Sequence, residues 1–246
     1  MLTDNAKFLL VAPREDDQAG AAEYLDFLEV SGLDRDQLDR VKLTNRSHSL
    51  PELSQYAGIM IGGSEYNVSD PDPSGEHQYV QDQIRSLIDG PTPLLIACYG
   101  AGLAAGSVTR EIREPAGVSL VQLTEAAADD PLLRGVAQEF WACTGHNDTI
   151  DELGEGNVLL ATGPTCPIQM FRRGDHVWVT QFHSELTGDG LVRRMEFYRN
   201  GKYFSNEEFD EIAREVRSHD YTPTISILRN FVDFTSTYSA TSTYSA

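Results

Sequence analysis

Short, almost wholly apolar segments alternate with longer segments of helical periodicity in the first half of this 246-residue chain. Three apolar segments, at residues 7–12, 57–61 and 94–97, lack the polar alternation of a strand with one solvated face. The segments at residues 18–30 and 76–88 place apolar side chains at helical spacing. Because strands that are apolar on both sides must be covered on both faces, we predict an α/β fold with a mostly parallel sheet flanked by helices.

The second half of the chain is richer in strand signals and ends in helical ones. Short apolar or alternating runs predict strands at residues 140–144, 158–162, 168–172 and 177–182. Helical patterns occupy residues 189–200, 205–219 and 224–234. The middle helix begins with Ser205 and Glu208, which have the spacing of a capping box.

The last residues have a composition unlike that of the rest. The sequence TSTYSA occurs twice over residues 235–246, and this uncharged, low-complexity repeat predicts a disordered tail. No convincing linker divides the remainder. We therefore predict one domain over residues 1–200, a helical C-terminal extension of that domain over residues 201–234, and the tail.

The charge and the cysteines exclude several classes of protein. With 38 Asp and Glu against 19 Lys and Arg, the net charge of −19 disfavours nucleic acid and anionic membranes as partners. The densest basic clusters are only Arg172-Arg173 and Arg193-Arg194. Three cysteines without CxxC spacing argue against disulfides and structural zinc. With no apolar run of membrane-spanning length, we expect a cytoplasmic protein that needs no metal or other cofactor.

Cys98 follows the apolar segment 94–97 and precedes a turn and a helix of small residues. This strand–Cys–helix order is the layout of a nucleophile elbow, in which a strained turn exposes the nucleophile above the sheet. The N–H of Tyr99 would then form one half of an oxyanion hole, and Gly100 fits the crowded turn. A lone cysteine is, however, more often a buried structural residue.

Three further segments contain groups that such a nucleophile needs. His183 and Glu185 follow the strand predicted at residues 177–182, where the histidine can act as general base and the carboxylate can orient it. Gly62-Gly63 follows a buried strand and could supply the second oxyanion donor. The polar loop at residues 145–148 (GHND) could line a site. Each segment taken alone has an ordinary structural explanation as a turn, a loop or a core residue.

The order of these motifs resembles that of the class I (triad-type) glutamine amidotransferases, in particular the glutaminase domain of GMP synthase. The likeness spans residues 5–200, and QFHSE at residues 181–185 is its most specific part, with Ser184 in place of a proline. It implies a flavodoxin-like fold with the site at the carboxyl ends of the strands. It also implies that Cys98 is the nucleophile, His183 the general base and acid, and Glu185 the orienting carboxylate.

The resemblance further implies a reaction and a set of binding residues. The thiol would attack the side-chain amide of glutamine, form a γ-glutamyl thioester and release ammonia. The residues implied to form the oxyanion hole are Gly62, Gly63 and Tyr99. Those implied to bind substrate are Gly100, Gly102, His146, Asn147 and Asp148. A separate synthetase subunit would be the partner that accepts the ammonia, whereas the sequence leaves a homo-oligomer open.

Two positions depart from the family pattern and leave the substrate open. Ile96 replaces a glycine two residues before the nucleophile, and Gly102 replaces a glutamine that helps to hold the substrate. The first hypothesis is a free-standing enzyme that hydrolyses glutamine or a γ-glutamyl compound. A second is a γ-glutamyl peptide hydrolase whose pocket is widened at Gly102. A third is a catalytically silent, flavodoxin-like binding module.

Overall fold

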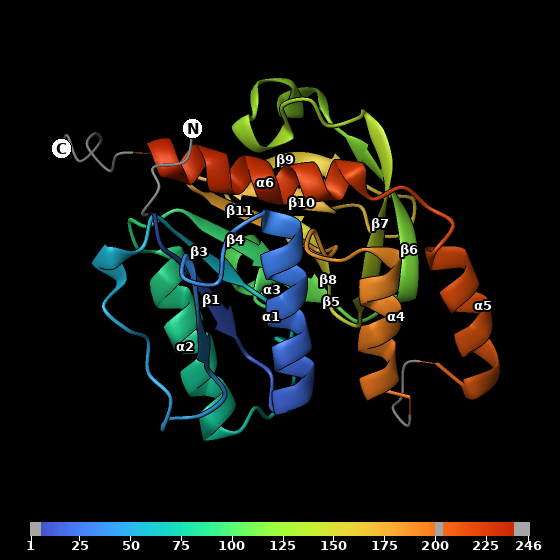
Figure 1. Cartoon of the computed structure of the whole chain (residues 1–246), viewed down its shortest axis with the longest axis horizontal. Helices are drawn as coiled ribbons and strands as arrows, with labels where there is room; N and C mark the ends of the chain where they lie inside the picture. The colour runs from blue at the N-terminus through green and yellow to red at the C-terminus, as the bar shows by residue number, and fades with distance from the viewer. Residues whose placement is uncertain (1–5, 200–203, 239–246) are drawn as a thin grey trace.

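A nine-stranded sheet forms the centre of the computed structural model, which describes residues 6–199 and 204–238. Its strands are β1 (Phe8–Ala12), β2 (Leu38–Lys42), β3 (Gly58–Ile61), β4 (Leu94–Ala97), β6 (Glu114–Leu123), β7 (Glu139–His146), β9 (Asn157–Thr162), β10 (Met170–Arg173) and β11 (Val177–Thr180). They lie in the order β2-β1-β3-β4-β11-β10-β9-β6-β7 (Figure 1). A separate two-stranded sheet pairs β5 (Gly106–Thr109) with β8 (Thr149–Leu153).

The large sheet has a parallel half and an antiparallel half. Strands β2, β1, β3, β4 and β11 pair in parallel, whereas β10, β9, β6 and β7 continue the sheet antiparallel from β11. The predicted α/β, flavodoxin-like fold is confirmed, in a mixed form of the sheet. All residues of β3, β4 and β11 are buried, as their apolar sequences predict.

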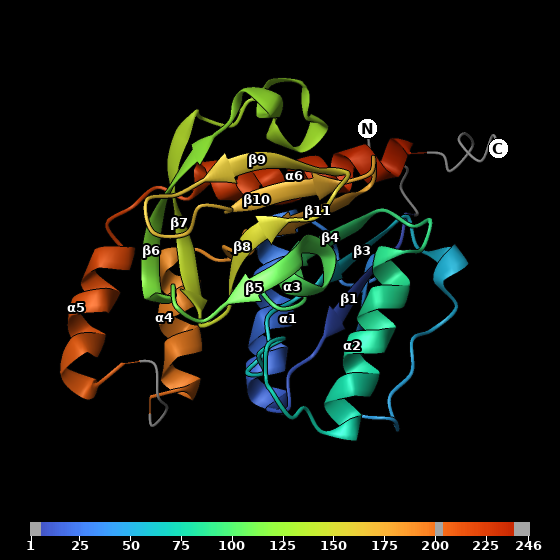
Figure 2. The ribbon, with the colours of Figure 1, turned by 180° about the vertical axis from the view of Figure 1, so that it is seen from behind.

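Helices flank the large sheet. They are α1 (Asp17–Ser31), α2 (Gly75–Ile88), α3 (Ala101–Ala105), α4 (Gly188–Phe197), α5 (Asn206–Val216) and α6 (Thr222–Thr237). Figures 1 and 2 show α1 and α6 on one face and α2 and α3 on the other. On the first face Trp178 packs edge-on against Phe231 of α6, with their ring centroids 6.2 Å apart. None of the described helices is long and apolar enough to cross a lipid bilayer.

The C-terminal helices agree with the sequence prediction except at their ends. The capping box between Ser205 and Glu208 is present at the start of α5. Helix α4 ends at Phe197, short of residue 200, and α6 continues to Thr237. The predicted start of the tail at residue 235 is therefore wrong, because α6 continues past it; residues 239–246 lie outside the described part.

Strand β2 shows why some elements escape sequence prediction. It lies at the edge of the sheet, and only Leu38 of its five residues is buried. The remaining side chains are half-exposed and include Asp39, Arg40 and Lys42, so the segment lacks the apolar run that marks the central strands. Polar side chains are tolerated on an edge strand because one of its sides faces solvent.

Candidate active site

Cys98 occupies a strained turn at the carboxyl end of β4. Its φ of 64° lies in the left-handed region, where no other non-glycine residue of the described chain is found. The Cys98 N–H donates to the carbonyl of Thr180 at 2.8 Å, which fixes the turn to the end of β11. Gly100 follows with a φ of 90°. The side chain of Cys98 remains partly exposed, so the geometry is that of a nucleophile elbow.

We predict that this strain opposes stability. A side chain in the left-handed region costs roughly 1–2 kcal/mol, which glycine does not incur. Cys98→Gly should therefore unfold with a free energy about 1 kcal/mol higher than that of Cys98→Ala. Urea unfolding of both variants measures the difference. Equal stabilities would show that the turn stores no strain.

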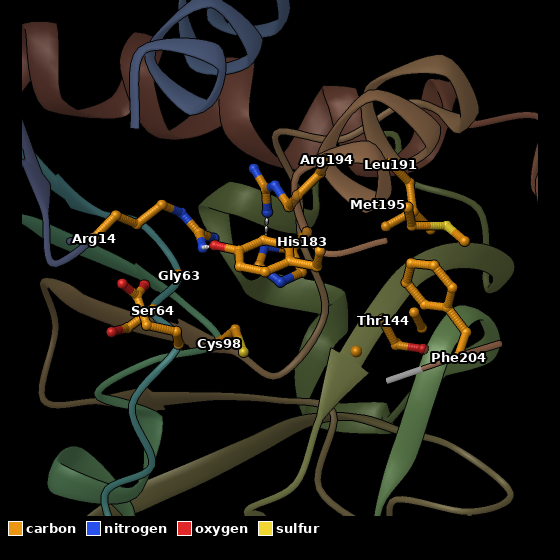
Figure 3. Close-up of a pocket in the computed structure, with 14 residues that line it drawn as sticks. Arg14, Gly63, Ser64, Cys98, Thr144, His183, Leu191, Arg194, Met195 and Phe204 are labelled. Carbon is orange, nitrogen blue, oxygen red and sulfur yellow. Dashed lines mark hydrogen bonds between the residues drawn. The ribbon is translucent and has the colours of Figure 1, made fainter. Parts of the chain in front are cut away.

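His183 lies three residues beyond the end of β11 and faces Cys98. Its N–H donates to the carbonyl of Cys143 at 2.9 Å, which fixes the backbone beside β7. The ring Nδ1 lies 2.7 Å from Oε1 of Glu185. Because a carboxylate only accepts hydrogen bonds, Nδ1 must carry the proton. Cys98 and His183 line the same cavity, and the interaction with Cys98 helps to raise the pKa of the ring. The structure thus brings together the thiol, the imidazole and the carboxylate, of which Figure 3 shows Cys98 and His183.

Arg194 of α4 is a buried component of the same cluster. Its Nη2 lies 3.1 Å from Oε1 of Glu185, and its Nη1 lies 3.1 Å from Nδ1 of His183. Burial lowers the pKa of His183, but attraction by Glu185 and hydrogen bonds to Cys98 and Glu185 outweigh burial and raise it to about 9. Burial raises the pKa of Glu185, whereas His183 and Arg194 lower it to about 2. His183 is therefore protonated at neutral pH.

These shifts predict how stability depends on pH. The raised pKa of His183 stabilises the fold below its ordinary value of 6.5, and this contribution is lost as the pH rises through about 9. The depressed pKa of Glu185 stabilises above its ordinary value of 4.5, and this contribution is lost as the pH falls towards about 2. The contribution of the pair should be greatest between about 4.5 and 6.5. Urea unfolding at a series of pH values should show the free energy of unfolding of the wild type falling on both the acid and the alkaline side. In Glu185→Gln both decreases should be smaller.

The two glycines predicted to complete the oxyanion hole have other hydrogen-bond partners. The N–H of Gly62 donates to the carbonyl of Val11 at 3.1 Å, which contradicts its predicted role. The N–H of Gly63 donates to Oε1 of Glu23 at 3.0 Å and would have to leave that carboxylate to reach an oxyanion. A Cβ on Gly63 would lie 2.6 Å from Nη2 of Arg14 and 3.0 Å from Cε1 of His183, so a larger residue here would displace the guanidinium of Arg14.

Tyr99 directly follows Cys98 in the elbow, as expected, and its side chain is held by helix α2. The buried ring places its hydroxyl 2.7 Å from Nε2 of His77 on α2. This contact fixes the residue that follows the nucleophile. The role of the Tyr99 N–H as an oxyanion donor stays a prediction.

Gly102 does not widen the pocket in the way that the sequence suggests. A Cβ at this position would lie 2.5 Å from Cγ1 of Val108 and 3.4 Å from Cγ1 of Val68. These two valines fill the space that a larger residue would need. The predicted extra room at Gly102 is therefore absent, because β5 brings Val108 against α3.

The predicted polar loop lies beside Cys98, but part of it is used structurally. His146 is buried, with Nε2 3.1 Å from Oε2 of Glu114 and Nδ1 2.9 Å from the carbonyl of Asp148. The carboxylate of Asp148 accepts from the N–H of Ser69 at 2.9 Å and pairs with Arg110. Both ring nitrogens of His146 are thus occupied, whereas the side chain of Asn147 remains at the cavity wall.

Two cavities meet at Cys98 and share Ser64 and Gly145. The first, shown in Figure 3, extends from Arg14 past His183 to an apolar wall. That apolar wall consists of Leu191, Met195 and Phe204. The second is lined by the elbow, α3 and the polar loop, including Tyr99, Gly102, Val108 and Asn147. The described residues contain no group of three or more His, Cys, Asp or Glu side chains placed to hold a metal ion.

Sequence reasoning missed the buried ion-pair network behind the triad. Arg14 donates from Nε to Oε1 of Glu23 at 2.9 Å, and Arg194 lies 3.6 Å from the same oxygen. Arg194 appears in the sequence only as part of a basic dipeptide. Glu23 and Asp26 do carry a signal, because helical spacing places them on the buried face of α1 with Phe27. A charged residue at a position where a helix is otherwise apolar indicates that an oppositely charged side chain is buried beside it.

Comparison with known proteins yields partial sequence matches and a matching fold, although no family model matches the chain. It is 35% identical over 145 residues to a glutamine-hydrolysing GMP synthase of Porphyromonas gingivalis, covering 56% of this chain and 27% of the relative. It is 26% identical over 173 residues to gamma-glutamyl peptidase 3 of Arabidopsis thaliana, covering 65% and 67% of the two chains.

The solved structure of a glutamine amidotransferase from Thermotoga maritima superposes with a TM-score of 0.73 at 18% identity, covering 95% of this chain and 99% of that one. In the sequence comparison, the chain spans only about a quarter of the length of the GMP synthase that it matches. The resemblance to class I glutamine amidotransferases predicted from the motifs is confirmed.

Proposed function

Because the chain resembles the class I glutamine amidotransferases in motif order and in fold, we propose that it is a cysteine amidohydrolase of glutamine or γ-glutamyl compounds. The observation that carries this proposal is the grouping of three residues: Cys98 and His183 line one cavity, and Nδ1 of His183 lies 2.7 Å from Oε1 of Glu185. Nucleophile, base and orienting carboxylate stand in sequence at the carboxyl ends of adjacent strands β4 and β11. A silent binding module would need none of these contacts.

The proposed reaction has two halves. In the first, the thiolate of Cys98 attacks the side-chain amide carbon and a C–S bond forms. The C–N bond then breaks as His183 gives its Nε2 proton to the departing nitrogen. In the second half, neutral His183 takes a proton from water, whose oxygen attacks the thioester. Glutamate is released and the thiol is regenerated, while Glu185 stabilises the imidazolium in each half.

The relatives favour two substrates within this chemistry. The GMP synthase relative supports glutamine, with ammonia passed to a separate synthetase subunit. The gamma-glutamyl peptidase relative supports a γ-glutamyl peptide, and the first cavity provides space beside His183 for a leaving group larger than ammonia. Assembly with a synthetase or with a second copy, and a cytoplasmic location, stay predictions.

A substrate panel tests the proposal. Wild-type protein is incubated with glutamine and with several γ-glutamyl dipeptides, and glutamate release is followed by a coupled assay. Turnover of at least one substrate and a covalent γ-glutamyl adduct on Cys98, detected by mass spectrometry after rapid acid quench, are expected. Absence of turnover and of the adduct with every substrate would refute the proposed function.

A further inference from the structure

The two cavities divide the substrate into an acyl part and a leaving part. The scissile carbonyl must lie at Cys98, where the cavities meet. The departing nitrogen must face His183, because His183 supplies its proton. Among the described residues, His183 lines the first cavity and not the second. The first cavity is therefore the side of the leaving group, and the second is the side of the γ-glutamyl group.

Arg14 offers an unused hydrogen-bond donor to the first cavity. Its side chain is only 5% exposed, with Nε on Glu23 at 2.9 Å and Nη1 on the hydroxyl of Tyr198 at 2.8 Å. The structure gives Nη2 no partner within the described residues, and this nitrogen lies at Gly63, on the side that His183 also approaches. Nη2 is not among the fully buried side-chain atoms that lack a partner, so its N–H groups can be reached by an acceptor on a ligand in the cavity.

Glu65 offers the matching acceptor. Its Oε1 accepts the N–H of Glu15 at 2.8 Å, whereas Oε2 is buried with no hydrogen-bond partner in the described chain. Burial opposes the charge of Arg14, but neighbouring carboxylates, Glu23 foremost and Glu65 among them, raise its pKa. Among the described residues, the ion pair of Arg14 is with Glu23 and not with Glu65. Arg14 and Glu65 line the same cavity, and each has one side-chain atom, Nη2 and Oε2, with no hydrogen-bond partner in the described chain.

The far side of the first cavity is apolar. Leu191 and Met195 come from α4, and Phe204 precedes α5. Figure 3 shows these three side chains grouped across the cavity from Arg14. Such a wall favours burial of an apolar side chain of the ligand. Ammonia, the leaving group of glutamine, would use neither the polar pair nor this wall.

We propose that the first cavity is a leaving-group subsite for an α-amino acid with an apolar side chain. Its α-carboxylate binds Nη2 of Arg14, its nitrogen lies between His183 and Oε2 of Glu65, and its side chain packs on Leu191, Met195 and Phe204. When the C–N bond breaks, the nitrogen gains the proton of His183 and then one from solvent, and the resulting ammonium pairs with Glu65. This inference rests on the proposed function and narrows its substrate to γ-glutamyl dipeptides with an apolar second residue.

A pair of substrates tests the carboxylate contact without changing the protein. We expect wild-type kcat/KM for γ-glutamyl-leucine to exceed that for γ-glutamyl-leucinamide, and that for glutamine, by at least about tenfold, because the amide lacks the charge that Arg14 pairs. In Arg14→Gln the acid and the amide should be cleaved at nearly equal rates. Arg217→Gln, a matched change of a half-exposed arginine paired with Asp189, should keep the wild-type ratio.

The outcomes separate the subsite from the reaction. Equal wild-type kcat/KM for the acid and the amide would overturn the subsite and leave the proposed function standing. If neither is cleaved but glutamine is, the subsite is overturned and the proposed function stands. If none of the three is cleaved, the proposed function fails, and calorimetric binding to Cys98→Ala then decides the subsite. Tighter binding of γ-glutamyl-leucine than of its amide supports the subsite, and equal binding overturns it.

Discussion

Replacing Cys98 by alanine is expected to reduce turnover of the best substrate by at least about 10⁴-fold, the range seen when a catalytic nucleophile is removed. The thiol forms the thioester. Ser64 also lines the first cavity, but its hydroxyl donates to the carbonyl of Pro13 at 2.6 Å, so we expect that it does not replace the thiol. Since Cys98 lies at the surface of the turn, the variant should fold normally. Glutamate release measures the activity, and urea unfolding measures the stability.

The two other cysteines provide the matched control. Cys143 and Cys166 are buried, and burial raises the pKa of each to about 12, so both stay as unreactive thiols. Cys166→Ala should keep the activity, and iodoacetamide should inactivate the wild type by labelling Cys98 first. Residual activity of Cys98→Ala above a few per cent, or inactivation that tracks labelling of Cys166, would place the chemistry elsewhere.

The grouping of Cys98, His183 and Glu185 could be predicted from the sequence because these residues follow apolar strands. Cys98 comes directly after β4, and His183 comes shortly after β11. In a parallel sheet the carboxyl ends of neighbouring strands meet, so two motifs far apart in sequence converge at one edge. The pairing of β4 with β11 confirms this adjacency. Predicting a parallel sheet therefore placed both residues at its carboxyl edge, whereas the structure shows that β4 and β11 are neighbours.

The side chains that surround Cys98, His183 and Glu185 could not be predicted in this way. Whether Gly102 leaves a cavity depends on Val108, which a separate two-stranded sheet brings against α3. Whether the Gly63 N–H is available depends on Glu23, forty positions away along the chain. Local patterns report which face of an element is buried, but not which side chain from another element fills a given space. The network of Arg14, Glu23 and Arg194 is of this kind.

Replacing Glu185 by glutamine is expected to lower kcat/KM by about 10³–10⁴-fold, as when the carboxylate of a catalytic triad becomes an amide. A neutral amide cannot stabilise the imidazolium, and its NH₂ can donate to Nδ1 and enforce the wrong tautomer. The nearby guanidinium of Arg194 is then left without its partner at 3.1 Å. The residual activity should also change its dependence on pH.

The pH profile distinguishes loss of charge from loss of structure. Attraction by Glu185 is the strongest of the effects that raise the pKa of His183 to about 9. In Glu185→Gln the alkaline limb of kcat/KM should therefore shift from about 9 towards the ordinary value of 6.5 or below. Ser184→Ala is the matched control, because its buried hydroxyl has no hydrogen-bond partner in the described chain. This control should keep the alkaline limb in place, and an unshifted limb in Glu185→Gln would mean that the carboxylate does not set the protonation of His183.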